Sequence, residues 1–149
     1  MAIETVLLAV GPGDEDRVDQ LASAVADVAG PAGATVVLAH VFTADEFDEV
    51  VDRLDYDPTG QPNPDEVAAR HATIRSLADD LDEGDVGYAI RGAVGEHGET
   101  IVDLAEAVSA DSVFVGGRKR SPTGKAVFGS TAQEVMLSAP CPVTFVRMD

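Results

Sequence analysis

Short apolar runs alternate with stretches of helical spacing along this chain. Residues 5–10, 35–41 and 112–115 are nearly continuous apolar runs, which predict strands buried on both faces, as in parallel sheets. Residues 142–146 predict a further strand. Another is predicted where Val86, Tyr88 and Ile90 alternate with less apolar residues. The pattern therefore predicts five strands.

Between these runs, apolar residues recur every three or four positions, which predicts amphipathic helices. The main helices are predicted over residues 14–29, 63–81, 101–108 and around 132–136, and a short acidic helix within 42–62. The first helix is expected to end at Gly30-Pro31. Asn63 at the N-cap and Pro64 at the first position form a helix start signal for the second helix.

Strands that alternate with helices predict an α/β fold with a single doubly wound parallel sheet and helices on both faces. A length of 149 residues, 45% of them hydrophobic, suits one domain covering residues 1–149. Chains of this type often have the strand order 3-2-1-4-5. That order would place a ligand crevice at the carboxyl ends of the first and fourth strands, at 11–13 and 116–117.

The composition excludes several classes of function. The chain has 27 acidic and 10 basic residues, a net charge of −17, which argues against nucleic acid and anionic membranes as partners. It has no run of about 18 apolar residues and no signal-peptide pattern, so a cytoplasmic protein is expected. The single Cys141 excludes an internal disulfide. The many Asp residues suggest a halophilic surface, adapted to high salt.

The charge is unevenly distributed along the chain. Residues 1–112 carry 25 acids and five bases, whereas residues 113–149 carry two acids and five bases. Four of the bases fall within one glycine-containing loop: Arg118, Lys119, Arg120 and Lys125. Because the rest of the protein is acidic, this concentration of bases predicts that the loop binds an anion.

The same loop leads to Gly129-Ser130-Thr131, at the predicted start of the last helix. Free backbone N–H groups and the positive end of the helix dipole suit that position to a phosphate. The loop does not match a Walker A motif, and Gly11-Pro12-Gly13 lacks the third glycine of a dinucleotide fingerprint. An alternative interpretation is that Ser130 is only an N-cap and that the bases balance an acidic face.

At these residues the chain resembles the universal stress protein family. The family pattern is Gly, two residues, Gly, nine residues, Gly, then Ser or Thr, and it matches Gly116, Gly129 and Ser130. The second motif glycine is Lys119 here, and the Asp that usually follows the first strand is Gly11. The resemblance extends over the whole chain, so the protein is identified as a member with a degenerate ATP-binding motif.

The resemblance implies that ATP or a related adenine nucleotide binds between strands 1 and 4, with a divalent ion such as Mg²⁺ carried by the phosphates. The implied site residues are Ala9, Gly11, Val41, Gly116, Arg118, Lys119, Gly129, Ser130 and Thr131. Val41 would offer backbone groups to the adenine, and Arg118 and Lys119 would act as counter-charges. The resemblance also implies the 3-2-1-4-5 strand order and a homodimer through the last strand, Val143 to Val146.

No general base can be identified, so the expected function is regulatory nucleotide binding in a stress response, with slow or no hydrolysis. Two alternatives stay open: a nucleotide-free dimeric interaction protein in which Lys119 blocks the site, and an ATP-dependent phosphotransferase. The histidines have structural interpretations, with His40 packed and hydrogen-bonded, His71 inside a helix and His97 in a turn. The acids of residues 79–83 are expected to be solvated.

Overall fold

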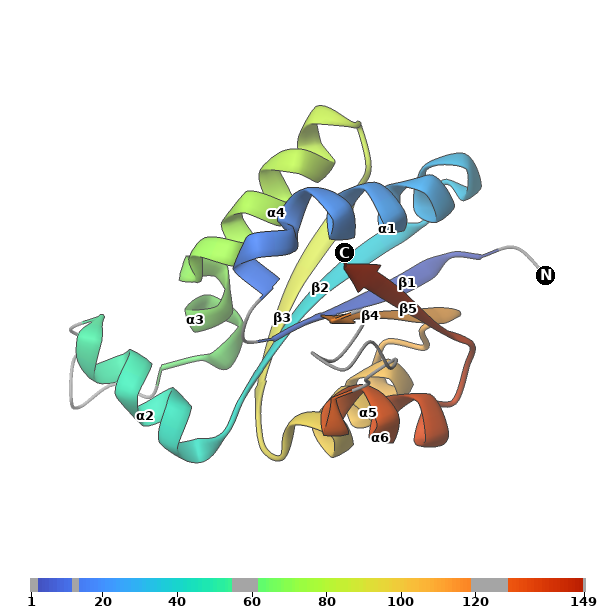
Figure 1. The fold of residues 1–149 in the computed structure, drawn as a ribbon. Coiled ribbons are helices and arrows are strands. Elements are labelled where there is room, and N and C mark those ends of the chain that lie inside the picture. The colour runs from blue at the N-terminus through green and yellow to red at the C-terminus, as the bar shows by residue number, and fades with distance from the viewer. Residues whose placement is uncertain (1–2, 12–13, 55–61, 119–128, 149) are drawn as a thin grey trace.

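The computed structural model describes residues 3–11, 14–54, 62–118 and 129–148. Its centre is a five-stranded sheet with all strands parallel and the order β3-β2-β1-β4-β5, which confirms the predicted topology (Figure 1). The strands are β1 (Thr5–Val10), β2 (Thr35–Phe42), β3 (Tyr88–Val94), β4 (Ser112–Arg118) and β5 (Val143–Met148).

Helices cover both faces of this sheet. The helices are η1 (Asp14–Arg17), α1 (Val18–Ala32), α2 (Ala44–Arg53), α3 (Pro64–Arg70), α4 (Ala72–Glu83), α5 (His97–Ala107) and α6 (Ser130–Ser138). Figure 1 shows α1 and α4 on one face and α5 and α6 on the other. This is the doubly wound arrangement that right-handed crossovers produce.

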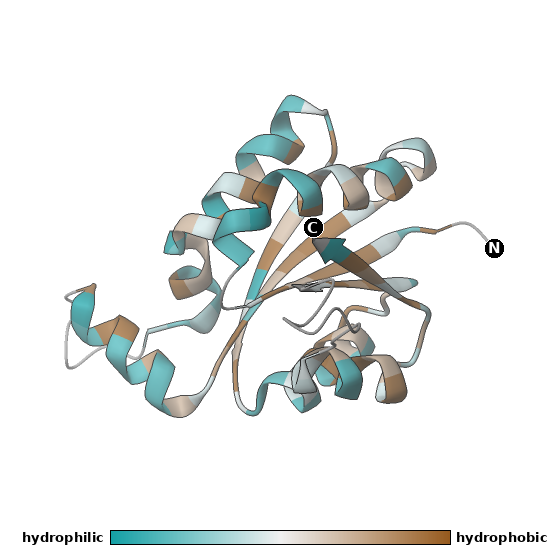
Figure 2. Cartoon of the chain, in the orientation of Figure 1, coloured by the Kyte–Doolittle hydropathy of each residue, from teal (hydrophilic) through white to brown (hydrophobic). Residues whose placement is uncertain are grey.

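Each strand of the sheet centre contributes to two hydrophobic cores. In β1, Val6 and Leu8 point to the core under α1 and α4, whereas Leu7 and Ala9 point to the core under α5 and α6. Burial on both faces explains why these runs are continuously apolar. Figure 2 shows the apolar strands between helices whose outer faces are hydrophilic. Among the described helices, none combines the length and the apolar composition that crossing a bilayer requires.

The short acidic helix predicted within 42–62 is α2. Thr43 and Glu46 form a capping box at its start. Its apolar residues Phe47, Val50, Val51 and Leu54 pack against a third, smaller cluster formed by Phe42, Val67 and Ala68. The apolar side of α2 is therefore used within the fold, at the end of β2.

The prediction that the first helix ends at Gly30-Pro31 is wrong. The helix begins with the 3-10 turn η1, and α1 continues through Pro31 to Ala32. It ends at Gly33, which has a φ of 67° and donates its N–H to the carbonyls of Ala29 and Gly30. This left-handed glycine closes the last turn of the helix.

The helix predicted over residues 63–81 is two helices. Asn63 is the N-cap, as predicted, and its side chain accepts a hydrogen bond from the N–H of Asp65 at 2.8 Å. The break is at His71, whose backbone is extended with φ −68° and ψ 131°. The ring of His71 stacks on His40, with 4.3 Å between ring centroids. His71 therefore joins two helices instead of lying inside one.

The fourth strand does not end at its glycines. β4 continues through Gly116 and Gly117 to Arg118, paired with β5. A Cβ at Gly117 would lie only 2.8 Å from the ring of Phe145. Gly117 therefore provides space for an aromatic side chain of the neighbouring strand.

The packing at Gly92 yields a test of the fold. A Cβ at this position would overlap the backbone carbonyl of Pro64, and the Gly92 N–H donates to Asp65 Oδ1 at 2.6 Å. Gly92→Ala should therefore lower the free energy of unfolding by about 2 to 3 kcal/mol, because backbone atoms must move. Urea denaturation measures this loss.

At Gly87 an added Cβ meets no described atom within 4 Å, so Gly87→Ala should change the free energy of unfolding by less than about 0.5 kcal/mol. Equal losses in the two variants would contradict the explanation.

Candidate functional site

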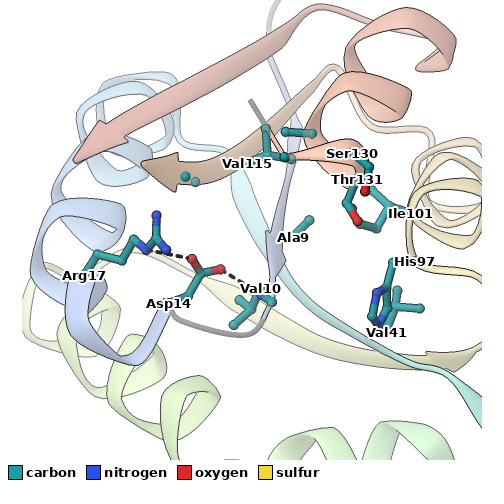
Figure 3. A pocket seen from close by; sticks show the side chains of 15 residues that line it. Ala9, Val10, Asp14, Arg17, Val41, His97, Ile101, Val115, Ser130 and Thr131 are labelled. Carbon is teal, nitrogen blue, oxygen red and sulfur yellow. Dashed lines mark hydrogen bonds and ion pairs between the residues drawn. The ribbon is translucent and has the colours of Figure 1, made fainter. Parts of the chain in front are cut away.

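A cavity of about 430 Å³ lies at the carboxyl ends of β1 and β4. Its walls come from the ends of β1, β2 and β4, from η1, and from the first turns of α5 and α6 (Figure 3). The chain adds β2 and β3 on one side of β1 and then β4 and β5 on its other side. Where the strand order reverses in this way, the connections diverge and leave a crevice at the carboxyl ends of the strands. The fold therefore produces a ligand-sized hollow where the strand order predicts one.

Most of the residues predicted for the site line this cavity. They are Ala9, Gly11, Val41, Gly116, Gly129, Ser130 and Thr131. Arg118 is the last residue of β4. Lys119 lies outside the described residues, as do Arg120 and Lys125.

The α6 N-terminus faces the cavity without a side-chain cap. Gly129 is the N-cap in an extended conformation, and Ser130 and Thr131 are the first two helical residues. The interpretation of Ser130 as an N-cap is therefore wrong. The first helical hydrogen bond runs from Gln133 N–H to the Gly129 carbonyl at 3.0 Å, so the N–H groups before it have no acceptor within the helix. This arrangement suits an anion, which the helix dipole also favours.

Asp14 and Arg17 of η1 line the cavity too, and the sequence did not indicate them as site residues. The Asp14 carboxylate is buried, accepts the Gly11 N–H at 2.7 Å and lies 3.1 Å from Arg17 Nε. Burial raises the pKa of Asp14, although Gly11 and Arg17 act in the opposite direction. Asp14 therefore places a carboxylate beside Gly11, the position where the resemblance implied that an acid is missing.

His97 is another lining residue that the sequence did not indicate. It is the first residue of α5, so the predicted turn is wrong, and its Nε2 lies 2.8 Å from Glu46 Oε1. Glu46 Oε1 also accepts the Thr43 N–H at 2.7 Å. Partial burial raises the pKa of Glu46, but the hydrogen bonds from Thr43 and His97 outweigh this effect and lower it overall. Glu46 is thus an ionised acceptor at neutral pH.

The remaining walls are mainly apolar: Ala9, Val10, Val41, Ile101, Val115 and Ala132. Figure 3 shows His97 beside Val41, with Ile101 between them and the pair Ser130 and Thr131. The cavity therefore combines apolar walls with a helix N-terminus that suits an anion. Such a combination is typical of sites for small molecules that carry both an apolar and a charged part.

A second hollow, of about 490 Å³, is unsuited to an anion. Acids of η1, α1 and α4 line it: Glu15, Asp16, Asp19, Asp79, Asp80 and Glu83. Desolvation, together with the nearby Asp19 and Glu83, raises the pKa of Asp80. The acids of the segment 79–83 thus border a groove of strongly negative charge, which repels phosphate.

Comparison with known sequences assigns the family. A sequence profile described as the universal stress protein family matches residues 2–147. The chain belongs to the universal stress protein family. A universal stress protein of Mycolicibacterium smegmatis is 31% identical over 80 residues, which cover 53% of this chain. The match spans 62% of that relative, less than two thirds of its length.

Solved universal stress protein structures share the fold. One from Archaeoglobus fulgidus is 28% identical, with a TM-score of 0.66 over 96% of this chain and 98% of that one. A universal stress protein in complex with cAMP is 20% identical, with a TM-score of 0.67 over the whole of both chains. Another from A. fulgidus, in complex with dAMP, is 22% identical, with a TM-score of 0.63 over 98% and 99% of the two chains.

Outside the cavity of this universal stress protein, His40 is buried at the end of β2. Its ring stacks on His71 and meets Phe42 edge-on, with 4.4 Å between the centroids of His40 and Phe42. Among the described residues, no group hydrogen-bonds its Nδ1. Burial, and next the proximity of His71, lower the pKa of His40 to about 4; Glu46 acts in the opposite direction. His40 is therefore neutral at pH 7 and packed, as predicted.

The buried His40 predicts acid sensitivity of the fold. Its pKa is about 4 in the folded state and about 6.5 when unfolded, so protonation favours the unfolded chain. The free energy of unfolding should fall by up to about 3 kcal/mol between about pH 7 and pH 4 through this group alone. His40→Phe removes this titrating group. The difference in the free energy of unfolding between the wild type and the variant should therefore shrink or reverse as the pH falls. Urea denaturation across this range measures it, and parallel pH profiles would contradict the prediction.

Proposed function

We propose that this universal stress protein binds an adenine nucleotide, with ATP as the physiological ligand, in the cavity between β1 and β4. The observation that carries the proposal is the uncapped N-terminus of α6 at one end of an apolar cavity. The phosphates would accept hydrogen bonds from the first N–H groups and hydroxyls of α6, at Ser130 and Thr131. Gly129, at which an added Cβ would meet no described atom within 4 Å, lets the phosphates approach the backbone, whereas Leu21 occupies the space beside Gly116.

The other end of the cavity suits the base. Ala9, Ile101 and Val115 offer apolar surface to a planar ring, and the Val41 backbone provides polar groups at the strand end. Arg118 and Lys119 would act as counter-charges for the phosphates, and a divalent ion such as Mg²⁺ would be carried by the phosphates of ATP. Solved relatives described as complexes with cAMP and dAMP support an adenine nucleotide as the ligand class.

The cavity favours binding over catalysis. Asp14 is the one carboxylate among the described lining residues, and its oxygens are engaged by the Gly11 N–H and Arg17. These two contacts give Asp14 a structural role, in which it holds the turn that follows β1. We therefore propose a regulatory protein of the stress response that hydrolyses its nucleotide slowly or not at all.

We also propose a homodimer formed through β5, over Val143 to Val146. β5 is an edge strand, so one side of its backbone has no neighbour in the sheet. On the adjacent α6, Leu137 is 87% exposed, an unusual position for a leucine. A second copy at this edge would pair the strand and cover Leu137.

Nucleotide binding is tested by placing a negative charge at the phosphate end. Isothermal titration with ATP should show binding by the wild type. Ser130→Asp should weaken it about tenfold or more, because the new carboxylate competes with the phosphate and repels it. The fold should be kept, since an acid is favourable at a helix N-terminus.

Ser138→Asp makes the same substitution at the opposite end of α6, where the residue is exposed, and should leave the affinity unchanged. The titrations are performed at low salt and at about 1 M KCl, because an exterior adapted to high salt needs screening of its negative charge. Absence of heat for the wild type in both buffers would refute nucleotide binding and favour the nucleotide-free alternative.

The dimer is tested by sedimentation velocity. The wild type should sediment as a dimer, and Leu137→Glu should shift it toward the monomer, because the charge would be buried in the interface. Val94, which is 41% exposed at the opposite edge strand, provides the matched control, and Val94→Glu should leave the dimer intact. A wild-type monomer at micromolar concentration would contradict the proposal.

A further inference from the structure

His97 is held in one orientation by a chain of hydrogen bonds. Thr43 and Glu46 form the capping box of α2, in which Thr43 Oγ1 accepts the Glu46 N–H at 3.2 Å and Glu46 Oε1 accepts the Thr43 N–H at 2.7 Å. The same Oε1 lies 2.8 Å from His97 Nε2. The glutamate is thus anchored on its own helix and engages one ring nitrogen of His97.

The charge of Glu46 determines the tautomer of His97. An ionised carboxylate only accepts hydrogen bonds, so Nε2 of His97 must carry the proton that it donates to Glu46. In the neutral imidazole the other nitrogen, Nδ1, is then a bare acceptor. Within the described part of the chain, no residue donates a hydrogen bond to Nδ1. His97 therefore offers an unpaired acceptor to whatever binds beside it.

His97 stands at the base end of the cavity. It lies beside Val41, with Ile101 between it and the α6 N-terminus (Figure 3). A nucleotide whose phosphate is held at Ser130 and Thr131 extends its base toward His97. The imidazole and the Val41 backbone would then meet the polar edge of that base.

We propose that His97, oriented by Glu46, selects bases that present an amino group over bases that present a carbonyl. Among purines this selects a 6-amino purine, such as adenine, over a 6-oxo purine, such as hypoxanthine. The inference rests on the proposed function and adds a specificity-determining residue to it. An amino group donates to Nδ1, whereas a carbonyl oxygen would place two acceptors against each other and lose a hydrogen bond.

The selectivity is measured with adenosine 5′-monophosphate and inosine 5′-monophosphate, which differ mainly at this edge of the base. Isothermal titration of the wild type should show adenosine monophosphate binding roughly tenfold to a hundredfold more tightly, as expected for one unpaired buried polar group. Equal affinities would overturn the role of His97 and leave the proposed function intact. Absence of binding by both nucleotides and by ATP would overturn the two proposals together.

The role of Glu46 is tested with a variant that does not change His97. Glu46→Gln keeps a capping box, in which Gln serves as well as Glu, but its amide can accept from or donate to Nε2. Both tautomers of His97 become available, so the ratio of the two affinities should fall toward one. Glu49→Gln, the same substitution at an exposed position of α2, should keep the wild-type ratio within about twofold. Unchanged selectivity in Glu46→Gln would overturn the proposal.

The tautomer can also be observed without a ligand. Long-range ¹H–¹⁵N spectra of the wild type at pH 8 should show His97 protonated at Nε2, and the spectra of Glu46→Gln should show a mixture of the two tautomers. A wild-type imidazole protonated at Nδ1 would overturn the proposal. The spectrum does not depend on nucleotide binding, so it separates an error in the tautomer from an error in the proposed function.

Discussion

The burial of β1 on all sides is the constraint on which the rest of the structure depends. β2 and β4 pair with its two edges, and its side chains enter the cores on both faces of the sheet. A strand enclosed in this way must be apolar throughout and leaves no room for polar groups until it ends. Polar groups therefore gather beyond its carboxyl end, where the chain turns away and the cavity opens.

At that end, two sets of backbone N–H groups differ in whether a side chain of the protein accepts their hydrogen bonds. The Gly11 N–H is taken by the Asp14 carboxylate, which Arg17 holds in place, so this part of the cavity is internally paired. Within the described part of the chain, no side chain caps the first turn of α6. The contrast explains why the α6 end is suited to an incoming anion, whereas the η1 end is already paired within the protein.

The strong negative charge of the chain acts differently in different places. Acids gather in the groove between η1, α1 and α4. Among the described lining residues of the cavity, the acid is Asp14, which is paired with Arg17, and Glu46 lies behind the lining residue His97 at 2.8 Å. The acidic groove and the cavity therefore differ in charge, because among the described residues the cavity is lined by a single carboxylate, that of Asp14.

The hydrophobic pattern alone determined the strands, most helices and the α/β class, because a buried strand and an amphipathic helix each leave a periodic signature. The loop before α6 was visible as well, since glycines and bases lie close together in the chain. Local signals failed at Pro31, His71 and Gly117, where a left-handed glycine, a stacked ring and a neighbouring Phe decided the backbone. The contact between Glu46 and His97 joins residues 51 positions apart, so only the tertiary structure could bring that pair to the cavity.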